Sequence, residues 1–209
     1  MNSYYDFDID VEELVSRSAL DDYFYLQDIK SRKFYLNGEI NQFSVADIVR
    51  HILQYNSEDR GVPVEERKPI LLYISSVGGE VDSGYELIDA IEMSLTPVYT
   101  VVLGSAYSMA FLISLAGHKR YAMPNAKYLM HDGYNGASGS TMKVYDTMEF
   151  QKRAEERTKE YIIAHSQLTP EEYDAKLRVE WYMFADEALE KGFVDYIVDK
   201  ADVFINEVV

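Results

Sequence analysis

The stretch that decides the fold is VVLGSAYSMAFL, residues 101–112. Its β-branched, apolar start predicts a buried strand, Gly104 and Ser105 interrupt that pattern, and a helical apolar segment follows Ser108. A serine at such a junction lies beside the unpaired backbone N–H groups and the positive dipole end of a helix, which favour a developing oxyanion. Ser108 is therefore a candidate nucleophile, and the alternative is an ordinary serine N-cap.

A glycine pair follows the strong strand signal ILLYIS at residues 70–75. The segment SVGG at residues 76–79 is open to three interpretations: a phosphate-binding loop, half of an oxyanion hole with the N–H of Gly79 facing Ser108, or a tight turn. No lysine follows the glycines, and the carboxylates of Glu80 and Asp82 would repel a bound anion. The phosphate interpretation is therefore disfavoured.

A single histidine, His131, ends the apolar run KYLMH and precedes the glycine-rich segment 133–139. It is either a general base or a histidine whose hydrogen bonds are satisfied in the core. Asp132 is the adjacent acid, but neighbouring residues of a strand point to opposite faces. Asp132 is therefore a poor partner for orienting His131.

Composition predicts one acidic domain. The 209 residues are enough for a sizeable core, and 47% hydrophobic residues argue against disorder. The formal net charge of −16 disfavours a nucleic-acid partner and leaves no basic patch for an anionic lipid surface. The chain has no cysteine, which excludes disulfides and thiolate metal sites and fits a reducing compartment, so we expect a cytoplasmic protein. Its four histidines are scattered, and we expect no metal centre.

One uncharged segment, residues 98–117, is about as long as a membrane span. Gly104, Ser105 and Ser108 interrupt it, and its β-branched residues cluster in the first third. A buried strand that turns into a buried helix explains this asymmetry better, so we expect no membrane partner. The first eight residues are acidic and lack the pattern of a signal peptide.

The order of elements predicts an α/β fold, because strands and helices alternate along most of the chain. We expect a strand at 34–36 with a turn at Asn37-Gly38, and a helix capped by Ser44. Residues 141–165 predict a long helix whose middle is polar all round, and such helices usually bridge elements through solvent. Residues 1–28 form an N-terminal extension that is acidic at first and amphipathic around 11–15.

Four motifs in sequence resemble those of the Clp protease proteolytic subunit (ClpP) family. They are SVGG at 76–79, GSAYSMAF at 104–111, PN and LMH within 124–131, and FADEA with GFVD within 184–195. The match in order and spacing runs from about residue 34 to residue 198. The resemblance implies the ClpP/crotonase α/β fold, with repeated ββα units and a protruding helical handle at about 133–168. It also implies one peptidase domain at residues 29–209.

The resemblance also assigns roles. Ser108 matches the family's nucleophile and His131 its general base. The backbone N–H groups of Gly79 and Met109 match the two donors of the oxyanion hole. By the same comparison, no cofactor and no metal is needed for the acyl transfer.

Three positions depart from the family pattern. The catalytic aspartate of the family falls on Glu180, whose side chain is one methylene longer but can still accept the imidazole N–H and hold its tautomer. The alternative for Glu180 is a solvated surface charge. Val77 stands where the family has proline, and Ala110 where it has glycine; both changes are milder.

The function that the resemblance implies is a serine endopeptidase that cleaves peptides or unfolded proteins inside an oligomeric ring chamber. The implied partners are copies of the same chain, as stacked heptameric rings, and an AAA+ unfoldase. The alternatives are a weak or inactive subunit that assembles with an active homologue, a phage-type maturation protease, and a crotonase-type acyl-CoA enzyme. The last is disfavoured because the acidic chain offers no evident basic site for the CoA phosphates.

Overall fold

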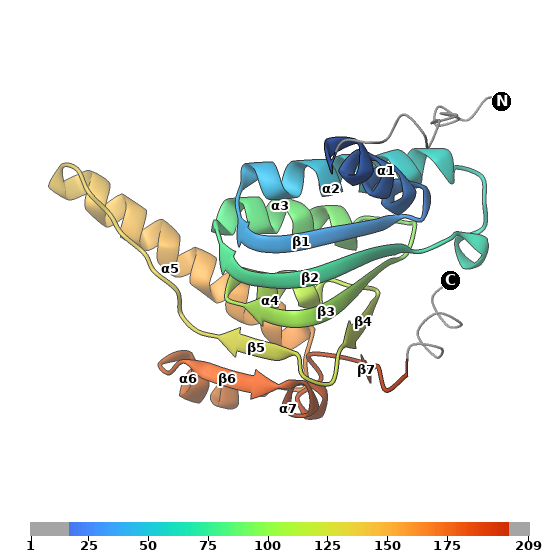
Figure 1. The fold of residues 1–209 in the computed structure, drawn as a ribbon. Coiled ribbons are helices and arrows are strands. Elements are labelled where there is room, and N and C mark those ends of the chain that lie inside the picture. The colour runs from blue at the N-terminus through green and yellow to red at the C-terminus, as the bar shows by residue number, and fades with distance from the viewer. Residues whose placement is uncertain (1–16, 201–209) are drawn as a thin grey trace.

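One seven-stranded sheet organises the molecule (Figure 1). The computed structural model describes residues 17–200. Five parallel strands follow one another across the sheet in the order β1-β2-β3-β4-β7. Their bounds are β1 Lys33–Ile40, β2 Ile70–Gly79, β3 Val98–Tyr107, β4 Lys119–Ala122 and β7 Tyr196–Ile197. The other two strands are β5 (Lys127–Met130) and β6 (Trp181–Phe184), which pair with each other in antiparallel fashion.

The sheet forks at β3. The first half of β3 pairs with β4, from Tyr99 to Val102, and its last three residues pair with β5 instead. The register of β3 against β2 shifts between these two halves, at Gly104 and its neighbours. Gly104 therefore interrupts the pairing without ending the strand. The fork brings the end of β5 beside the end of β3.

Seven α-helices and one short 3₁₀ helix, Val64–Glu66, accompany the sheet among residues 17–200. Helices α2, α3 and α4 lie together on one side of the sheet, α1 lies beside β1, and α5 projects from the body (Figure 1). Their bounds are α1 Arg17–Lys30, α2 Gln42–Glu58, α3 Val81–Glu92, α4 Met109–Leu115, α5 Thr141–Ala164, α6 Pro170–Leu177 and α7 Ala185–Glu190.

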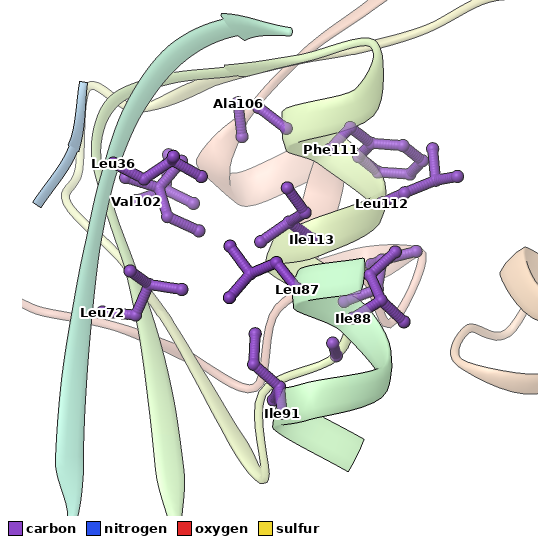
Figure 2. Close-up of a cluster of buried hydrophobic side chains, with 14 of the residues drawn as sticks. Leu36, Leu72, Leu87, Ile88, Ile91, Val102, Ala106, Phe111, Leu112 and Ile113 are labelled. Carbon is purple, nitrogen blue, oxygen red and sulfur yellow. The ribbon is translucent and has the colours of Figure 1, made fainter. Parts of the chain in front are cut away.

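The core fills the space between the sheet and these helices (Figure 2). Leu87, Ile88 and Ile91 face it from α3 at helical spacing, and Leu72 and Val102 face it from β2 and β3. Every residue of α4 is buried. Burying apolar surface in this layer contributes about 25 cal/mol per Å² and holds the strand ends in fixed positions.

The opposite face of the sheet carries a row of tyrosines that follows the strand register. Tyr35 lies opposite Tyr73, and Tyr121 lies between Val101 and Tyr196. The rings of Tyr35 and Tyr73 stack at 5.1 Å, and those of Tyr121 and Tyr196 at 5.2 Å. Tyr35 and Tyr196 remain about half exposed.

The protruding helix was predicted, and the structure gives it the bounds of α5. The chain between β5 and α5 runs along this helix to its far end (Figure 1), and Asn135 donates a hydrogen bond of 3.2 Å to Glu155. We keep the name handle for residues 133–168, which include α5. Only Ile162 of α5 is fully buried.

The expectation for the uncharged segment is confirmed. The uncharged segment 98–117 is the buried strand β3 followed by the buried helix α4. Within residues 17–200, no helix is long and apolar enough to cross a membrane.

Two expectations near β1 are wrong. Strand β1 does not turn at Gly38 but continues to Ile40, because Val77 of β2 forms a bulge that lets the strand pass through the positive φ of Gly38. Helix α2 begins at Gln42, since the side chain of Asn41 accepts two backbone N–H groups and caps it, and Ser44 is the reciprocal partner in the capping box.

The N-terminal extension divides at the limit of the described residues. The predicted amphipathic stretch at 11–15 lies outside the residues that the structure describes. Residues 17–28 of the extension belong to α1, which is anchored by the buried side chain of Ile29.

Candidate active site

Ser108 lies in the turn between β3 and α4 and has a strained backbone. Its φ is 54° and its ψ is −124°, a region that residues with a side chain rarely adopt. It occupies the N-cap position of α4, but its hydroxyl makes no capping hydrogen bond. The alternative of an ordinary serine N-cap is therefore wrong. A serine held on a strained strand-to-helix turn is the arrangement that exposes a nucleophilic hydroxyl in α/β hydrolases.

Three neighbouring segments hold this turn. The N–H of Ser108 donates to the carbonyl oxygen of Leu129 at 2.9 Å, and the N–H of Phe111 donates to the carbonyl oxygen of Ser108 at 2.9 Å. Gly78 approaches from β2: a Cβ atom there would lie 2.7 Å from the Cβ of Ser108 and 3.1 Å from the backbone nitrogen of Met109. Only glycine fits at position 78.

The glycine pair does not form a tight turn, which corrects one of the three interpretations. Gly78 and Gly79 are the last two residues of β2, and Gly79 pairs with Ile40. A Cβ at Gly79 would collide with the backbone of Ile40. Val77, where the family has proline, is the bulge residue of β2 and skips the pairing with β1, so a missing backbone N–H would be tolerated there.

The register between β5 and β6 brings His131 and Glu180 together. Met130 lies opposite Trp181 in this antiparallel pair, so the next positions outward are 131 and 180. The Nδ1 atom of His131 lies 3.3 Å from the Oε1 atom of Glu180. A carboxylate accepts hydrogen bonds only, so this contact fixes the proton of a neutral imidazole on Nδ1 and leaves the lone pair on Nε2. The Nε2 atom is buried and has no hydrogen-bond partner among residues 17–200.

A residue that the sequence analysis missed, Tyr182, contacts the second oxygen of Glu180. Its hydroxyl donates a hydrogen bond of 3.1 Å to Oε2, and its ring meets that of Tyr107 edge to face at 5.8 Å. The hydrogen bond to Glu180, together with smaller effects of burial and charge, raises the pKa of Tyr182. The signal in the sequence was the spacing of two, because Glu180 directly precedes β6 and residues two apart in extended backbone lie on the same side.

Two other acids that follow His131 are engaged elsewhere. Asp174 accepts a hydrogen bond of 2.7 Å from Lys159, and Asp195 forms an ion pair with Arg120. Glu180 is thus the acid that contacts His131, although its side chain is 60% exposed. No three histidine, aspartate or glutamate side chains among residues 17–200 are grouped so that they could hold a metal ion.

A hollow of about 830 Å³ elsewhere in the subunit is lined by none of the predicted site residues. It lies between β4, the end of α5 and α7, and Arg120 spans it from Asp195 to the backbone carbonyl of His165. These hydrogen bonds occupy the donors of the Arg120 guanidinium, so we assign Arg120 a structural role in this hollow.

Comparison with known proteins agrees with the geometry. A sequence model of the Clp protease family matches residues 17–201. The ATP-dependent Clp protease proteolytic subunit 2 of Treponema pallidum (strain Nichols) is 29% identical over 183 residues, which cover 85% of this chain and 87% of that relative. The ATP-dependent Clp protease proteolytic subunit of Streptococcus suis (strain 98HAH33) is 29% identical over 197 residues, which cover 92% of this chain and 97% of that relative.

The fold and these similarities define a ClpP-like serine peptidase, which is a hydrolase. The chain belongs to the Clp protease family, and the resemblance drawn from its four motifs is confirmed.

Proposed function

We propose that this chain is a serine endopeptidase of peptides or unfolded proteins, with Ser108, His131 and Glu180 as its triad. The observation that carries the proposal is the state of His131. One ring nitrogen is 3.3 Å from the carboxylate of Glu180, and the other is buried and has no partner among the described residues. A buried nitrogen without a hydrogen-bond partner lowers the stability of the fold. A role in exchanging a proton with a serine hydroxyl would explain why this nitrogen is kept.

The proposed reaction begins when the Oγ of Ser108 attacks the scissile carbonyl carbon and His131 takes the hydroxyl proton on Nε2. The N–H groups of Gly79 and Met109 then hold the oxyanion, and each such donor contributes on the order of a hundredfold to the rate. His131 passes the proton to the leaving amine as the peptide C–N bond breaks. A water molecule, deprotonated by His131, attacks the acyl-serine; the bond between the acyl carbon and Oγ breaks, the acid product leaves, and His131 returns the proton to the Oγ of Ser108.

Glu180 acts through His131 in this scheme. Its carboxylate holds the imidazole with the proton on Nδ1 and stabilises the imidazolium that forms during attack. It never needs to take a proton itself. The extra methylene of glutamate, relative to the family's aspartate, is accommodated because residue 180 directly precedes β6 and faces residue 131 across the strand pair.

We further propose a homo-oligomer of stacked rings. The handle supports this proposal, because the first half of α5 has exposed apolar side chains and projects away from its own subunit (Figure 1). Met142, Tyr145, Met148 and Phe150 are each more than half exposed. Exposed apolar groups gathered on one element are typical of a surface that another chain covers.

An AAA+ unfoldase is the proposed partner, and the cytoplasm the proposed compartment. The relatives are named ATP-dependent, which supports an ATP-hydrolysing unfoldase as the partner of this chain. The half-exposed rings of Tyr35 and Tyr196, at two places in the row of tyrosines, are aromatic groups of the kind enriched at protein interfaces.

Hydrolysis of a fluorogenic peptide and of an unfolded protein tests this function. Ser108→Ala and His131→Ala should each lose nearly all hydrolysis and keep the melting temperature. Ser105→Ala is the matched control, since it removes a serine hydroxyl from the same strand end, and it should hydrolyse at the normal rate. Normal hydrolysis by Ser108→Ala would refute the proposal.

A further inference from the structure

We propose that Tyr182 is a positioning residue that holds Glu180 against His131. This inference rests on the proposed function, because it assumes that Glu180 orients the base. It starts from an imbalance in the site: the side chain of Glu180 is 60% exposed, whereas that of His131 is only 15% exposed. An exposed glutamate samples many rotamers, and few of them reach the imidazole.

The two oxygens of Glu180 have different partners. Oε1 lies 3.3 Å from Nδ1 of His131, and Oε2 accepts a 3.1 Å hydrogen bond from the hydroxyl of Tyr182. Two contacts at the two ends of one carboxylate determine both its position and its plane. The contact with His131 is the longer one, so the second contact matters for selecting the rotamer that reaches the ring.

Tyr182 is itself fixed relative to the nucleophile. It lies opposite Leu129 in the β5–β6 pair, and the carbonyl of Leu129 accepts the N–H of Ser108. Its ring packs edge to face, at an interplanar angle of 89°, against Tyr107, the residue before Ser108. The hydroxyl that positions the acid is therefore carried by a ring that touches the strand of the nucleophile.

The length of the glutamate side chain explains why the contact between Tyr182 and Glu180 is needed. Glutamate has one more rotatable bond than the aspartate that the family motif leads one to expect, and ordering that bond has an entropic cost. The hydroxyl of Tyr182 offsets this cost with a charge-assisted hydrogen bond.

Tyr182→Phe is the direct test, because it keeps the ring on Tyr107 and removes only the hydroxyl. We expect kcat for a fluorogenic peptide to fall about threefold to tenfold, the range that one modest hydrogen bond allows, with KM unchanged. The melting temperature should stay the same. Tyr25→Phe is the matched control, because it removes a partly exposed hydroxyl on α1 that likewise donates to a carboxylate, that of Asp47, at 2.8 Å, and it should keep the normal kcat.

A double-mutant cycle separates positioning from a merely structural role. In the Glu180→Ala background the hydroxyl has no carboxylate to hold, so adding Tyr182→Phe should cause no further loss of kcat. An equal loss in both backgrounds, or a normal kcat for Tyr182→Phe alone, would overturn the inference.

The same cycle tells which proposal fails. If Glu180→Ala loses activity while Tyr182→Phe is normal, the triad stands and only the role of Tyr182 is refuted. If Glu180→Ala is fully active, Glu180 orients nothing, and both the triad and the role of Tyr182 are refuted.

Discussion

The backbone N–H of Ser108 donates a 2.9 Å hydrogen bond to the carbonyl oxygen of Leu129, which stands two residues before His131. The candidate nucleophile is thus tied to the strand that ends at the candidate base. This bond continues the pairing of β3 with β5, in which Tyr107 lies opposite Leu129. The relative position of the two residues is therefore set by sheet register and not by a loop, which favours a rigid site.

Position 78 should tolerate glycine only. Gly78→Ala would bring a Cβ within 2.7 Å of Ser108 and force a side chain into a φ of 96°, so we expect nearly complete loss of peptide hydrolysis. Gly61→Ala is the matched control, because Gly61 also has a positive φ, of 90°, but its Cβ would meet open space. It should lose about 1–2 kcal/mol of stability and keep its activity. Equal activities for the two variants would contradict the close approach of β2 to Ser108.

Glu180→Gln should preserve the fold and lose most activity. An amide cannot stabilise an imidazolium and can favour the wrong tautomer, and changing the triad aspartate of a serine protease to asparagine lowers kcat about ten-thousandfold for this reason. Glu180→Asp restores the family residue, but we expect incomplete rescue, because the shorter side chain has to span a gap formed around glutamate. Steady-state hydrolysis with melting curves measures both effects, and unaltered hydrolysis by Glu180→Gln would show the triad to be wrong.

The ion pair between Arg32 and Asp59 should make stability depend on pH. Burial alone would raise the pKa of Asp59, but hydrogen bonds from Arg32 and Thr96, together with the positive charges of Arg32 and Arg67, outweigh it and lower the pKa below its ordinary value of 3.8. A carboxyl with a lower pKa in the folded chain stabilises the fold above its unfolded pKa, and that contribution is lost as the pH falls through the folded value.

Asp59→Asn should therefore cost about 3 kcal/mol at pH 7, because it leaves the guanidinium of Arg32 without its partner. The difference in melting temperature from the wild type should shrink between pH 7 and pH 3. Asp174→Asn, which removes a more exposed ion pair with Lys159, should change the melting temperature little at either pH. A difference for Asp59→Asn that does not depend on pH would disprove this linkage.

The handle should hold subunits together through its apolar side chains. A Met148→Glu/Phe150→Glu variant should shift the mass measured by light scattering toward smaller species, because it puts charge where we expect a partner to pack. Lys143→Glu adds a carboxylate to the same half of α5 without removing an apolar group and should assemble normally. A wild-type protein that is a stable monomer at micromolar concentration would rule out the ring.

Local patterns in the sequence were enough to predict the strand and the helix on either side of Ser108. The apolar run before Gly104 and the helical spacing after Ser108 predicted β3 and α4, because burial and periodicity act within a few residues. His131 was correctly expected at a strand end. The motifs then supplied what no local pattern contains, namely that these segments belong to one site.

Errors arose where distant strands decide the local structure. Gly38 looked like a turn residue, but pairing with β2 and the bulge at Val77 keep it inside a strand. The Gly78-Gly79 pair also looked like a turn, but its pairing with β1 keeps it inside β2. Tyr182 was missed because its role depends on the pairing of β5 with β6, which joins segments about fifty residues apart in sequence.

Covalent labelling with a fluorophosphonate probe, located by mass spectrometry of the digested protein, tests the central claim most directly. We predict one adduct, on Ser108, which is absent from Ser108→Ala. Its formation should be on the order of a hundredfold slower in His131→Ala, because the general base is then missing. Labelling that persists in Ser108→Ala, or that proceeds at the normal rate without His131, would contradict the assignment of Ser108 and His131 as nucleophile and base.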